Sequence, residues 1–241
     1  MGKDVIIACD FQSGQECLNF LEAFGEKKPF IKIGMELFYA EGPDLVHQLK
    51  DRGYRIFLDL KLHDIPNTVM KAMQSLAKLK VDMINCHATG TVKMMEAAVQ
   101  AFEGWENPPL LIGVTQLTST TEDRLHSDLL VKETMEDYVL HLAKNTKSAG
   151  LNGVVCSPLE APAVHQTCGS DFITVTPGVR FEEDSKDDQA RVTSPEQAKI
   201  LGADYIVMGR SITRSADPVS RYEKALKDFI HEWPANRPNY R

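Results

Sequence analysis

Short apolar segments recur along the chain at fairly even intervals, with longer and more polar stretches between them. Each segment is rich in Ile, Val, Leu or Phe and is too short for an average helix. Continuous apolar character over about four to eight residues is typical of strands that are buried on both faces, as in a parallel sheet. The predicted strands are Val5–Cys9, Phe30–Gly34, Ile56–Leu62, Met83–His87, Leu110–Leu117, Gly153–Ser157, Phe172–Pro177 and Tyr205–Met208.

The stretches between these strands have the spacing of helices. Lys71–Lys80 and Val92–Phe102 are amphipathic, and Thr134–Ala149 is a third such segment. Ser194 has the character of a helix N-cap, with Pro195 at the first helical position. Strands that alternate with helices in this way predict a parallel sheet with crossover helices.

The number of strand–helix units favours a closed barrel. Eight units in 241 residues fit a (β/α)8, or TIM, barrel, which usually takes about 250 residues. An open, doubly wound sheet is the alternative, but no Gly-x-Gly-x-x-Gly turn follows the first strand. We find no linker and no shift in composition, so we expect residues 1–241 to form a single domain, with 233–241 as a frayed tail.

Composition and charge narrow the classes of function. The chain is 43% hydrophobic and 25% charged, and its 27 Lys and Arg against 34 Asp and Glu give a net charge of −7, which disfavours a general nucleic-acid binder. No apolar run approaches the roughly 20 residues of a membrane span, and the N-terminus lacks the pattern of a signal peptide. The five cysteines include no Cys-x-x-Cys pair, so we expect buried, reduced thiols in a cytoplasmic protein.

Polar residues end most of the predicted strands. In a barrel of this type the active site lies at the carboxyl ends of the strands, so these residues are the candidates for chemistry. They include Asp10, Lys32, Asp59, Lys61, Asp64, His87, Thr118, Arg180 and Arg210.

The third strand is the most informative, because Asp59 and Lys61 alternate with leucines along it. Side chains in a strand alternate between faces, so the leucines should meet the helices while the charged side chains point into the barrel mouth. Charges placed there need partners, and Lys32 and Asp10 on neighbouring strand ends can supply them. The cluster is either a set of ordinary rim salt bridges or a functional network; four charges on three strand ends favour the network.

Asp64 falls on the opposite face from Asp59 and Lys61 by the same alternation. Pro66 follows closely, so the chain is expected to turn into a loop at this point. The residues leave two interpretations open: Asp64 caps the following helix, or it reaches a site on another subunit.

The end of the last strand predicts a phosphate site. Loops after strands seven and eight of barrels often hold phosphate; there, Gly209 allows close approach of the backbone, and Arg210 offers a bidentate contact. Arg180, after strand seven, adds a second guanidinium. The acidic segment 181–191 that follows is either a solvated surface loop or a mobile lid that brings Gln189 inward. We see no His-Glu-x-x-His and no other metal-binding spacing, so no metal site is predicted.

Six motifs together resemble those of the orotidine 5′-phosphate decarboxylase family, in the family's order. They are Ala8–Phe11, Ile31–Gly34, Asp59–Thr68, Gln116–Ser119, Thr176–Arg180 and Met208–Ser211. The resemblance implies a (β/α)8 barrel that converts orotidine 5′-monophosphate to UMP and CO2, the last step of de novo UMP biosynthesis. It also implies that neither a metal nor an organic cofactor is needed.

The resemblance assigns roles to the charged cluster. By analogy with the family, Lys61 is the proton donor to C6 of the pyrimidine, and Asp59 sits beside the departing carboxylate. Lys32 and Asp10 hold the ribose hydroxyls and the charge network. Asp64 enters the site from the partner subunit, which implies a two-fold homodimer.

The remaining positions that match the family's motifs are expected to bind the substrate. Ile65 and Thr68 lie near Asp64, and Thr118 lies by the pyrimidine. The phosphate end and its lid are assigned Arg180, Gln189, Gly209 and Arg210.

Two other functions fit parts of the pattern. Sugar-phosphate decarboxylases and aldolases resemble this family in an Asp-x-Lys-x-x-Asp pattern but use Mg²⁺. A non-catalytic sensor would bind UMP without releasing CO2, although a sensor has no need for the costly array of Asp10, Lys32, Asp59 and Lys61.

Overall fold

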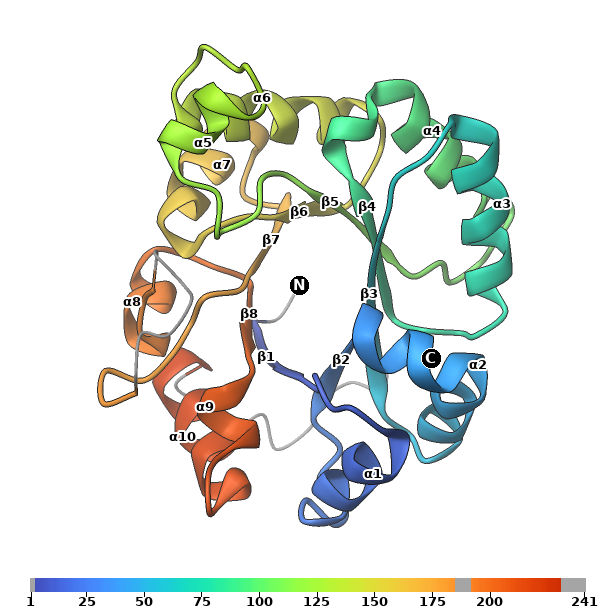
Figure 1. Ribbon diagram of the computed structural model, residues 1–241, viewed down its shortest axis with the longest axis vertical. Helices are drawn as coiled ribbons and strands as arrows, with labels where there is room; N and C mark the ends of the chain where they lie inside the picture. Colours follow the sequence, from blue (N-terminus) through green and yellow to red (C-terminus); the bar gives the residue numbers. More distant parts are fainter. Residues whose placement is uncertain (1–2, 185–191, 231–241) are drawn as a thin grey trace.

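The barrel predicted from the strand pattern is confirmed. A computed structural model describes residues 3–184 and 192–230, in which eight parallel strands form a closed barrel in chain order. Figure 1 shows the ring of strands with helices around it. The strands are β1 (Asp4–Ala8), β2 (Phe30–Gly34), β3 (Arg55–Leu62), β4 (Met83–His87), β5 (Leu110–Val114), β6 (Gly153–Val155), β7 (Ile173–Thr176) and β8 (Tyr205–Met208).

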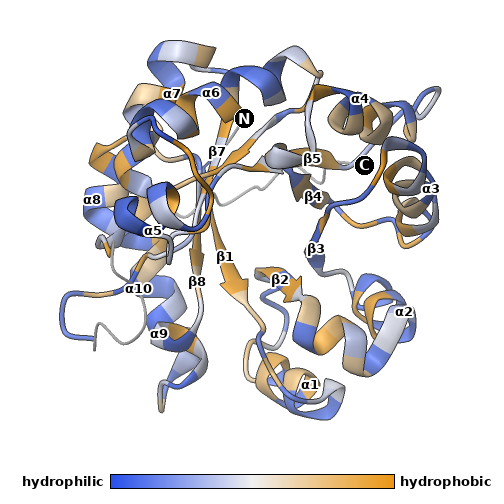
Figure 2. Ribbon diagram, turned by 45° about the horizontal axis from the view of Figure 1, so that its top comes forward, coloured by the Kyte–Doolittle hydropathy of each residue, from blue (hydrophilic) through white to orange (hydrophobic). Residues whose placement is uncertain are grey.

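The helices lie outside the barrel and carry both hydrophobic and hydrophilic residues, whereas the strands are mostly hydrophobic (Figure 2). They are α1 (Gly14–Glu22), α2 (Met35–Asp51), α3 (Pro66–Ala77), α4 (Val92–Gln100), α5 (Glu122–Ser127), α6 (Met135–Ser148), α7 (Ala161–Cys168), α8 (Pro195–Ile200), α9 (Arg210–Thr213) and α10 (Pro218–Ile230). Two short 3-10 turns, η1 (Ala88–Gly90) and η2 (Pro158–Glu160), follow β4 and β6.

Two apolar layers follow from the alternation of side chains along the strands. Inward-facing residues form a cluster inside the barrel that includes Phe30, Phe57 and Met83. Outward-facing residues such as Leu58 and Leu60 pack in the larger layer beneath the helices. The prediction that the leucine face of β3 meets the helices is therefore confirmed.

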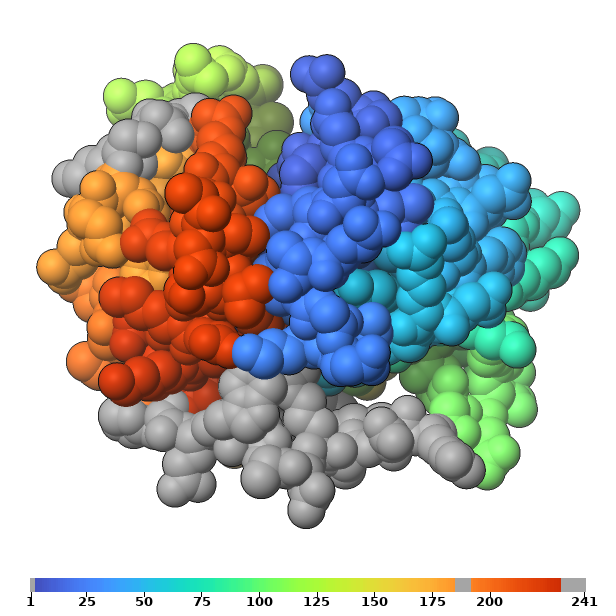
Figure 3. Space-filling model, turned by 90° about the horizontal axis from the view of Figure 1, so that it is seen from below, coloured from blue at the N-terminus to red at the C-terminus, as the bar shows by residue number. Residues whose placement is uncertain are grey.

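The two ends of the described chain meet at the barrel seam, where β1 pairs with β8. The helix α10 packs against β1, and the Tyr222 hydroxyl donates to the carbonyl oxygen of Val5 at 3.4 Å. Lys27, which follows α1, forms an ion pair with Glu223 of α10. Figure 3 shows the last helix beside the first part of the chain. The last helix thus covers the seam between the first and last strands.

Several element boundaries differ from the sequence expectations. The predicted helix at Lys71–Lys80 begins earlier, because Pro66 is the first residue of α3. The loop expected at Asp64 is confirmed, since residues 63–65 lie between β3 and α3. The predicted strand Leu110–Leu117 ends at Val114. The predicted strand Gly153–Ser157 ends at Val155, because the Ser157 side chain caps η2.

Other local expectations are confirmed. The Ser194 hydroxyl accepts a hydrogen bond from the Gln197 backbone N–H at 3.2 Å, and Pro195 is the first residue of α8. All five cysteines are buried. None of the helices in the part of the chain that the structure describes is both long enough and apolar enough to cross a membrane. The predicted tail 233–241 lies outside the described residues.

Candidate active site

A line of alternating charges crosses the carboxyl end of the barrel. The Lys32 ammonium lies 3.0 Å from Oδ1 of Asp10 and 3.4 Å from Oδ2 of Asp59. The Lys61 ammonium lies 2.7 Å from Oδ1 of Asp59. Asp59 and Lys61 continue the inward face of β3 that begins with Phe57. The structure therefore joins the four predicted charges into one chain, Asp10–Lys32–Asp59–Lys61.

Mutual pairing keeps the two inner members of this chain charged. Burial of Lys32 disfavours its charged form, but the carboxylates of Asp59 and Asp10 outweigh burial and raise its pKa. Burial of Asp59 likewise favours the neutral acid, but Lys32 and Lys61 outweigh it and lower the pKa of Asp59. Both groups are therefore ionised throughout the neutral pH range.

Close packing around Lys32 depends on Gly34, the last residue of β2. A Cβ atom at this position would lie 3.0 Å from the Lys32 ammonium and 3.2 Å from Oδ1 of Asp10. Any larger residue would therefore displace the ammonium or the carboxylate.

Lys61 lies in an irregular part of β3. Pairing with β4 runs from Leu58↔Ile84 to Leu62↔Cys86, so three residues of β3 lie opposite Asn85 alone. Lys61 has a φ of 50°, a left-handed conformation that costs a non-glycine residue roughly 1–2 kcal/mol. Bulges and strained residues of this type occur next to active sites, where they redirect a side chain.

Asn85 holds this irregular segment in place. It is fully buried on the inward face of β4. Its Oδ1 accepts a hydrogen bond from the Lys61 backbone N–H at 2.8 Å, and its Nδ2 donates to Oδ1 of Asp59 at 2.6 Å. One amide side chain thus fixes both the backbone of Lys61 and the carboxylate of Asp59.

We predict that Asn85→Ala lowers the free energy of unfolding by about 1–3 kcal/mol, because the Lys61 backbone N–H loses its hydrogen-bond acceptor and the Asp59 carboxylate loses one of its donors. Misplacement of Lys61 should also lower kcat/KM roughly 10- to 100-fold. The matched control is Asn152→Ala, since Asn152 accepts a hydrogen bond from the Leu111 N–H at 2.8 Å at the amino end of the barrel. Urea denaturation and steady-state kinetics of both variants test this prediction, and equal losses of activity would contradict it.

His87 and His63 lie side by side next to the charge chain, with ring centroids 5.4 Å apart. Burial lowers the pKa of His87, and the neighbouring His63 and Lys61 lower it further, against the opposing effect of Asp59. His87 is therefore neutral in the folded protein at neutral pH.

A histidine whose pKa is lowered by folding costs stability in acid. The unfolded chain takes up the proton below pH ~6.5, and the folded chain does so only at lower pH, so stability falls as the pH decreases through this window. We predict that His87→Gln reduces the loss of melting temperature between about pH 7.5 and pH 5.5. The exposed His47 provides the control variant His47→Gln. Identical pH dependence in the wild type and His87→Gln would contradict this prediction.

The segment that contains Asp64 lies at the surface of the chain. Asp64 and Thr68 are exposed, and Ile65 is 66% exposed. The Asp64 carboxylate accepts a hydrogen bond from the backbone N–H of Ile65 at 2.6 Å. Ile65 is the N-cap residue of α3, and no side chain caps this helix. The interpretation of Asp64 as a helix cap is therefore wrong.

The residues predicted for the phosphate end follow β7 and β8. Arg180 is 8% exposed, and its backbone N–H donates to the carbonyl oxygen of Thr193 at 3.0 Å. Gly209 is the N-cap residue of α9, and Arg210 is the first residue of that helix. Gln189 lies outside the described residues.

Thr118 lies in a turn after β5 and is half-buried. Among residues 3–184 and 192–230, no group of three or more His, Cys, Asp or Glu side chains is arranged to hold a metal ion.

Comparison with known proteins places the chain in a family. A sequence profile described as the orotidine 5′-phosphate decarboxylase / HUMPS family matches residues 3–225. The chain belongs to this family. A relative named orotidine 5′-phosphate decarboxylase, from Geobacillus sp. (strain WCH70), is 53% identical over 236 residues, which cover 96% of this chain and 99% of the relative. A protein of the same name from Bacillus mycoides (strain KBAB4) is 49% identical over 233 residues, or 95% of this chain and 98% of the relative.

A solved structure agrees with this membership of the decarboxylase family. The crystal structure of orotidine 5′-phosphate decarboxylase from Lactobacillus acidophilus matches with a TM-score of 0.85 and 39% sequence identity, and covers 94% of this chain and 99% of that chain. The sequence resemblance to the orotidine 5′-phosphate decarboxylase family is therefore confirmed.

Asn85 is the residue of this decarboxylase-family site that the sequence reasoning did not assign. A signal was present, because an asparagine stands among apolar residues in a buried strand. A buried amide must be hydrogen-bonded, and the neighbouring strand carries Asp59 and Lys61. Asn85 could therefore have been predicted to bind one of these two residues.

Proposed function

We propose that this protein decarboxylates orotidine 5′-monophosphate to UMP and CO2, and so acts as the carboxy-lyase of the last step of de novo UMP biosynthesis in the cytoplasm. The observation that carries the proposal is the chain Asp10–Lys32–Asp59–Lys61 at the carboxyl end of the barrel. The names of relatives that align over nearly the whole chain support it.

Lys61 is the group on which the chemistry depends. Loss of CO2 breaks the bond between C6 and the carboxyl carbon and leaves the electron pair on C6, in the plane of the ring, where no π system spreads the charge. A fixed ammonium at that position stabilises the developing charge without reorganisation, and then transfers its proton to C6. The Asp59 carboxylate, 2.7 Å from the ammonium, forms an ion pair with it and holds it in place.

The other members of the charge chain orient the substrate. We propose that Asp59 lies beside the departing carboxylate, where two like charges raise the energy of the bound substrate. Lys32 and Asp10 bind the ribose hydroxyls. Since Lys32 lies between the two carboxylates, it keeps both at fixed separation.

The site is completed by a second copy of the chain. We propose that Asp64 enters the partner's site across a two-fold dimer interface, with Ile65 and Thr68 next to it. The exposure of this segment and the large exposed fraction of Ile65, 66%, support this arrangement, because an exposed apolar residue next to an acidic one suits an interface close to a charged site.

The residues that we assign to the rest of the substrate follow β5, β7 and β8. We assign the phosphate to Arg180, Gly209, Arg210 and Gln189, and the pyrimidine to Thr118. A guanidinium group can donate two parallel hydrogen bonds to two oxygens of one phosphate, which supports this role for the two arginines.

The test of the proposed function is a balance of products. Orotidine 5′-monophosphate labelled in its carboxylate is mixed with the purified protein, and labelled CO2 and UMP are measured together. The proposal predicts that they form in equal amounts. Binding of UMP without release of CO2 would instead indicate a sensor and would contradict the proposal.

A further inference from the structure

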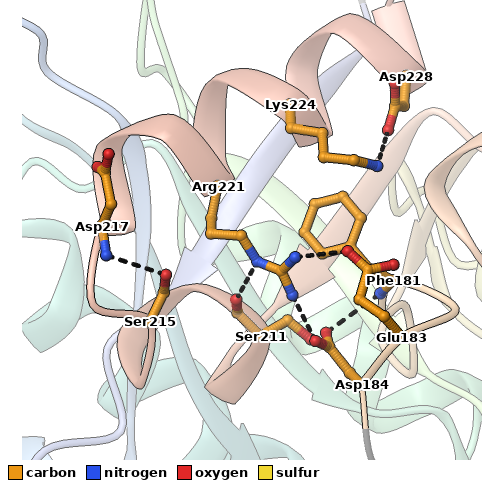
Figure 4. Close-up of polar contacts among 9 residues, drawn as sticks. All are labelled: Phe181, Glu183, Asp184, Ser211, Ser215, Asp217, Arg221, Lys224 and Asp228. Atoms are coloured by element: carbon orange, nitrogen blue, oxygen red, sulfur yellow. Dashed lines mark hydrogen bonds and ion pairs between the residues drawn. The ribbon is translucent and has the colours of Figure 1, made fainter.

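The side chain of Arg221, on α10, joins the two segments that carry the proposed phosphate-binding arginines (Figure 4). Its Nε–H donates to the carbonyl oxygen of Ser211 at 3.2 Å, and Ser211 directly follows Arg210. Its Nη1 lies 2.6 Å from the carboxylate of Glu183, and its Nη2 pairs with the carboxylate of Asp184. One guanidinium therefore ties the segment after β7 to the start of α9.

Phe181 adds further contacts between the segment after β7 and α10. It directly follows Arg180 in the chain and is only 2% exposed. The Arg221 guanidinium carbon lies 4.1 Å from the centre of its ring, and the Lys224 ammonium lies 4.3 Å from it. The Phe181 backbone N–H also donates to Oδ2 of Asp184 at 3.3 Å. The backbone next to Arg180 is thus held to α10 by both stacking and hydrogen bonds.

The packing of α10 on the barrel does not use this guanidinium. The buried residues of the helix are Tyr222, Ala225, Leu226 and Phe229. The Arg221 side chain is 22% exposed, and its partners are the loop carboxylates and one carbonyl oxygen. A fork of five donors has the geometry to hold three acceptors at fixed separations, which a lysine cannot do.

We propose that Arg221 is a positioning residue for the phosphate group: it sets the separation between Arg180 and Arg210 without contacting the ligand. This inference rests on the proposed function, in which those two arginines bind the 5′-phosphate. It predicts that loss of Arg221 weakens binding of nucleotides that carry the phosphate and leaves binding of the phosphate-free nucleoside unchanged.

The first test is Arg221→Ala, with titration calorimetry of UMP and of uridine as the readout. We expect the Kd of UMP to rise about tenfold or more, as for a lost charged hydrogen bond, with uridine unaffected. In kinetics, KM for orotidine 5′-monophosphate should rise much more than kcat falls. Arg221→Lys should restore part of the affinity. The matched control is Lys227→Ala, which changes an exposed lysine of the same helix and should leave the Kd of UMP within about twofold.

A second variant separates positioning from simple electrostatic attraction. The double change Glu183→Gln with Asp184→Asn removes two negative charges near the phosphate end and leaves Arg221 in place. Electrostatic attraction alone would make UMP bind more tightly. Positioning by Arg221 predicts weaker binding. It also predicts that adding Arg221→Ala causes a smaller further loss than Arg221→Ala causes in the wild type, because the contacts of Arg221 with the two carboxylates are already weakened.

The outcomes distinguish this inference from the proposed function. Tighter UMP binding by the double variant, or equal losses for UMP and uridine in Arg221→Ala, would overturn the positioning role and leave the decarboxylase intact. A wild-type protein that binds UMP but releases no CO2 would overturn the proposed function, and the UMP and uridine titrations would still decide the role of Arg221.

Discussion

Lys61→Ala is expected to lower kcat/KM for orotidine 5′-monophosphate by at least about 10³-fold, because it removes both the fixed cation and the proton donor at C6. The protein should stay folded. Asp59 would keep Lys32, 3.4 Å away, and Asn85, 2.6 Å away, as partners, so its carboxylate would not be left buried and unpaired. Steady-state kinetics and circular dichroism of the purified variant measure both effects.

A lysine at the other end of the barrel provides the control. Lys50 forms an ion pair with Asp82 at 2.7 Å, the same separation as between Lys61 and Asp59, but Asp82 directly precedes β4 at its amino end. Lys50→Ala should therefore keep nearly full activity. If Lys61→Ala kept activity near that of the wild type, Lys61 would be excluded as the proton donor.

Mixed dimers give the second large effect. Lys61→Ala and Asp64→Asn should each be nearly inactive alone, because each damages both sites of its own dimer. When the two are unfolded together and refolded, about half of the dimers contain one chain of each kind. One site of such a dimer then has both residues intact, so about a quarter of the wild-type activity should return.

The control for this mixing is a pair of variants at two residues that the same subunit contributes to one active site. Lys61 and Asp59 come from one strand, so mixing Lys61→Ala with Asp59→Asn should restore nothing: each mixed dimer still lacks one residue in each site. Failure of Lys61→Ala and Asp64→Asn to restore activity on mixing would contradict the exchange of Asp64 between subunits.

The eight strands were predictable because a barrel strand is buried on both faces and must be apolar along its length. The charged residues were predictable as candidates for the same reason: Lys32, Asp59 and Lys61 interrupt apolar strands at positions where an unpaired charge is costly. Alternation along β3 also predicted that Asp59 and Lys61 share a face, and their 2.7 Å ion pair agrees with this.

Other features depend on contacts between distant parts of the chain. The left-handed φ of Lys61 is maintained by an amide from β4, and nothing in the local sequence around Lys61 indicates it. The first turn of α3 is polar and exposed, so apolar periodicity begins only at Val69 and placed the start of the helix too late. The contacts of Arg221 join α10 to residues far earlier in the sequence, which no periodicity shows.

The most direct test of the central claim, that a lysine ammonium alone supplies the cation for decarboxylation, is ultraviolet absorbance of orotidine 5′-monophosphate mixed with the purified protein, with and without EDTA. We predict that the orotate absorbance falls at the same rate in both samples and stays constant with Lys61→Ala. Loss of the reaction in EDTA, as for a magnesium-dependent sugar-phosphate enzyme of the same fold, or an undiminished reaction in Lys61→Ala, would contradict it.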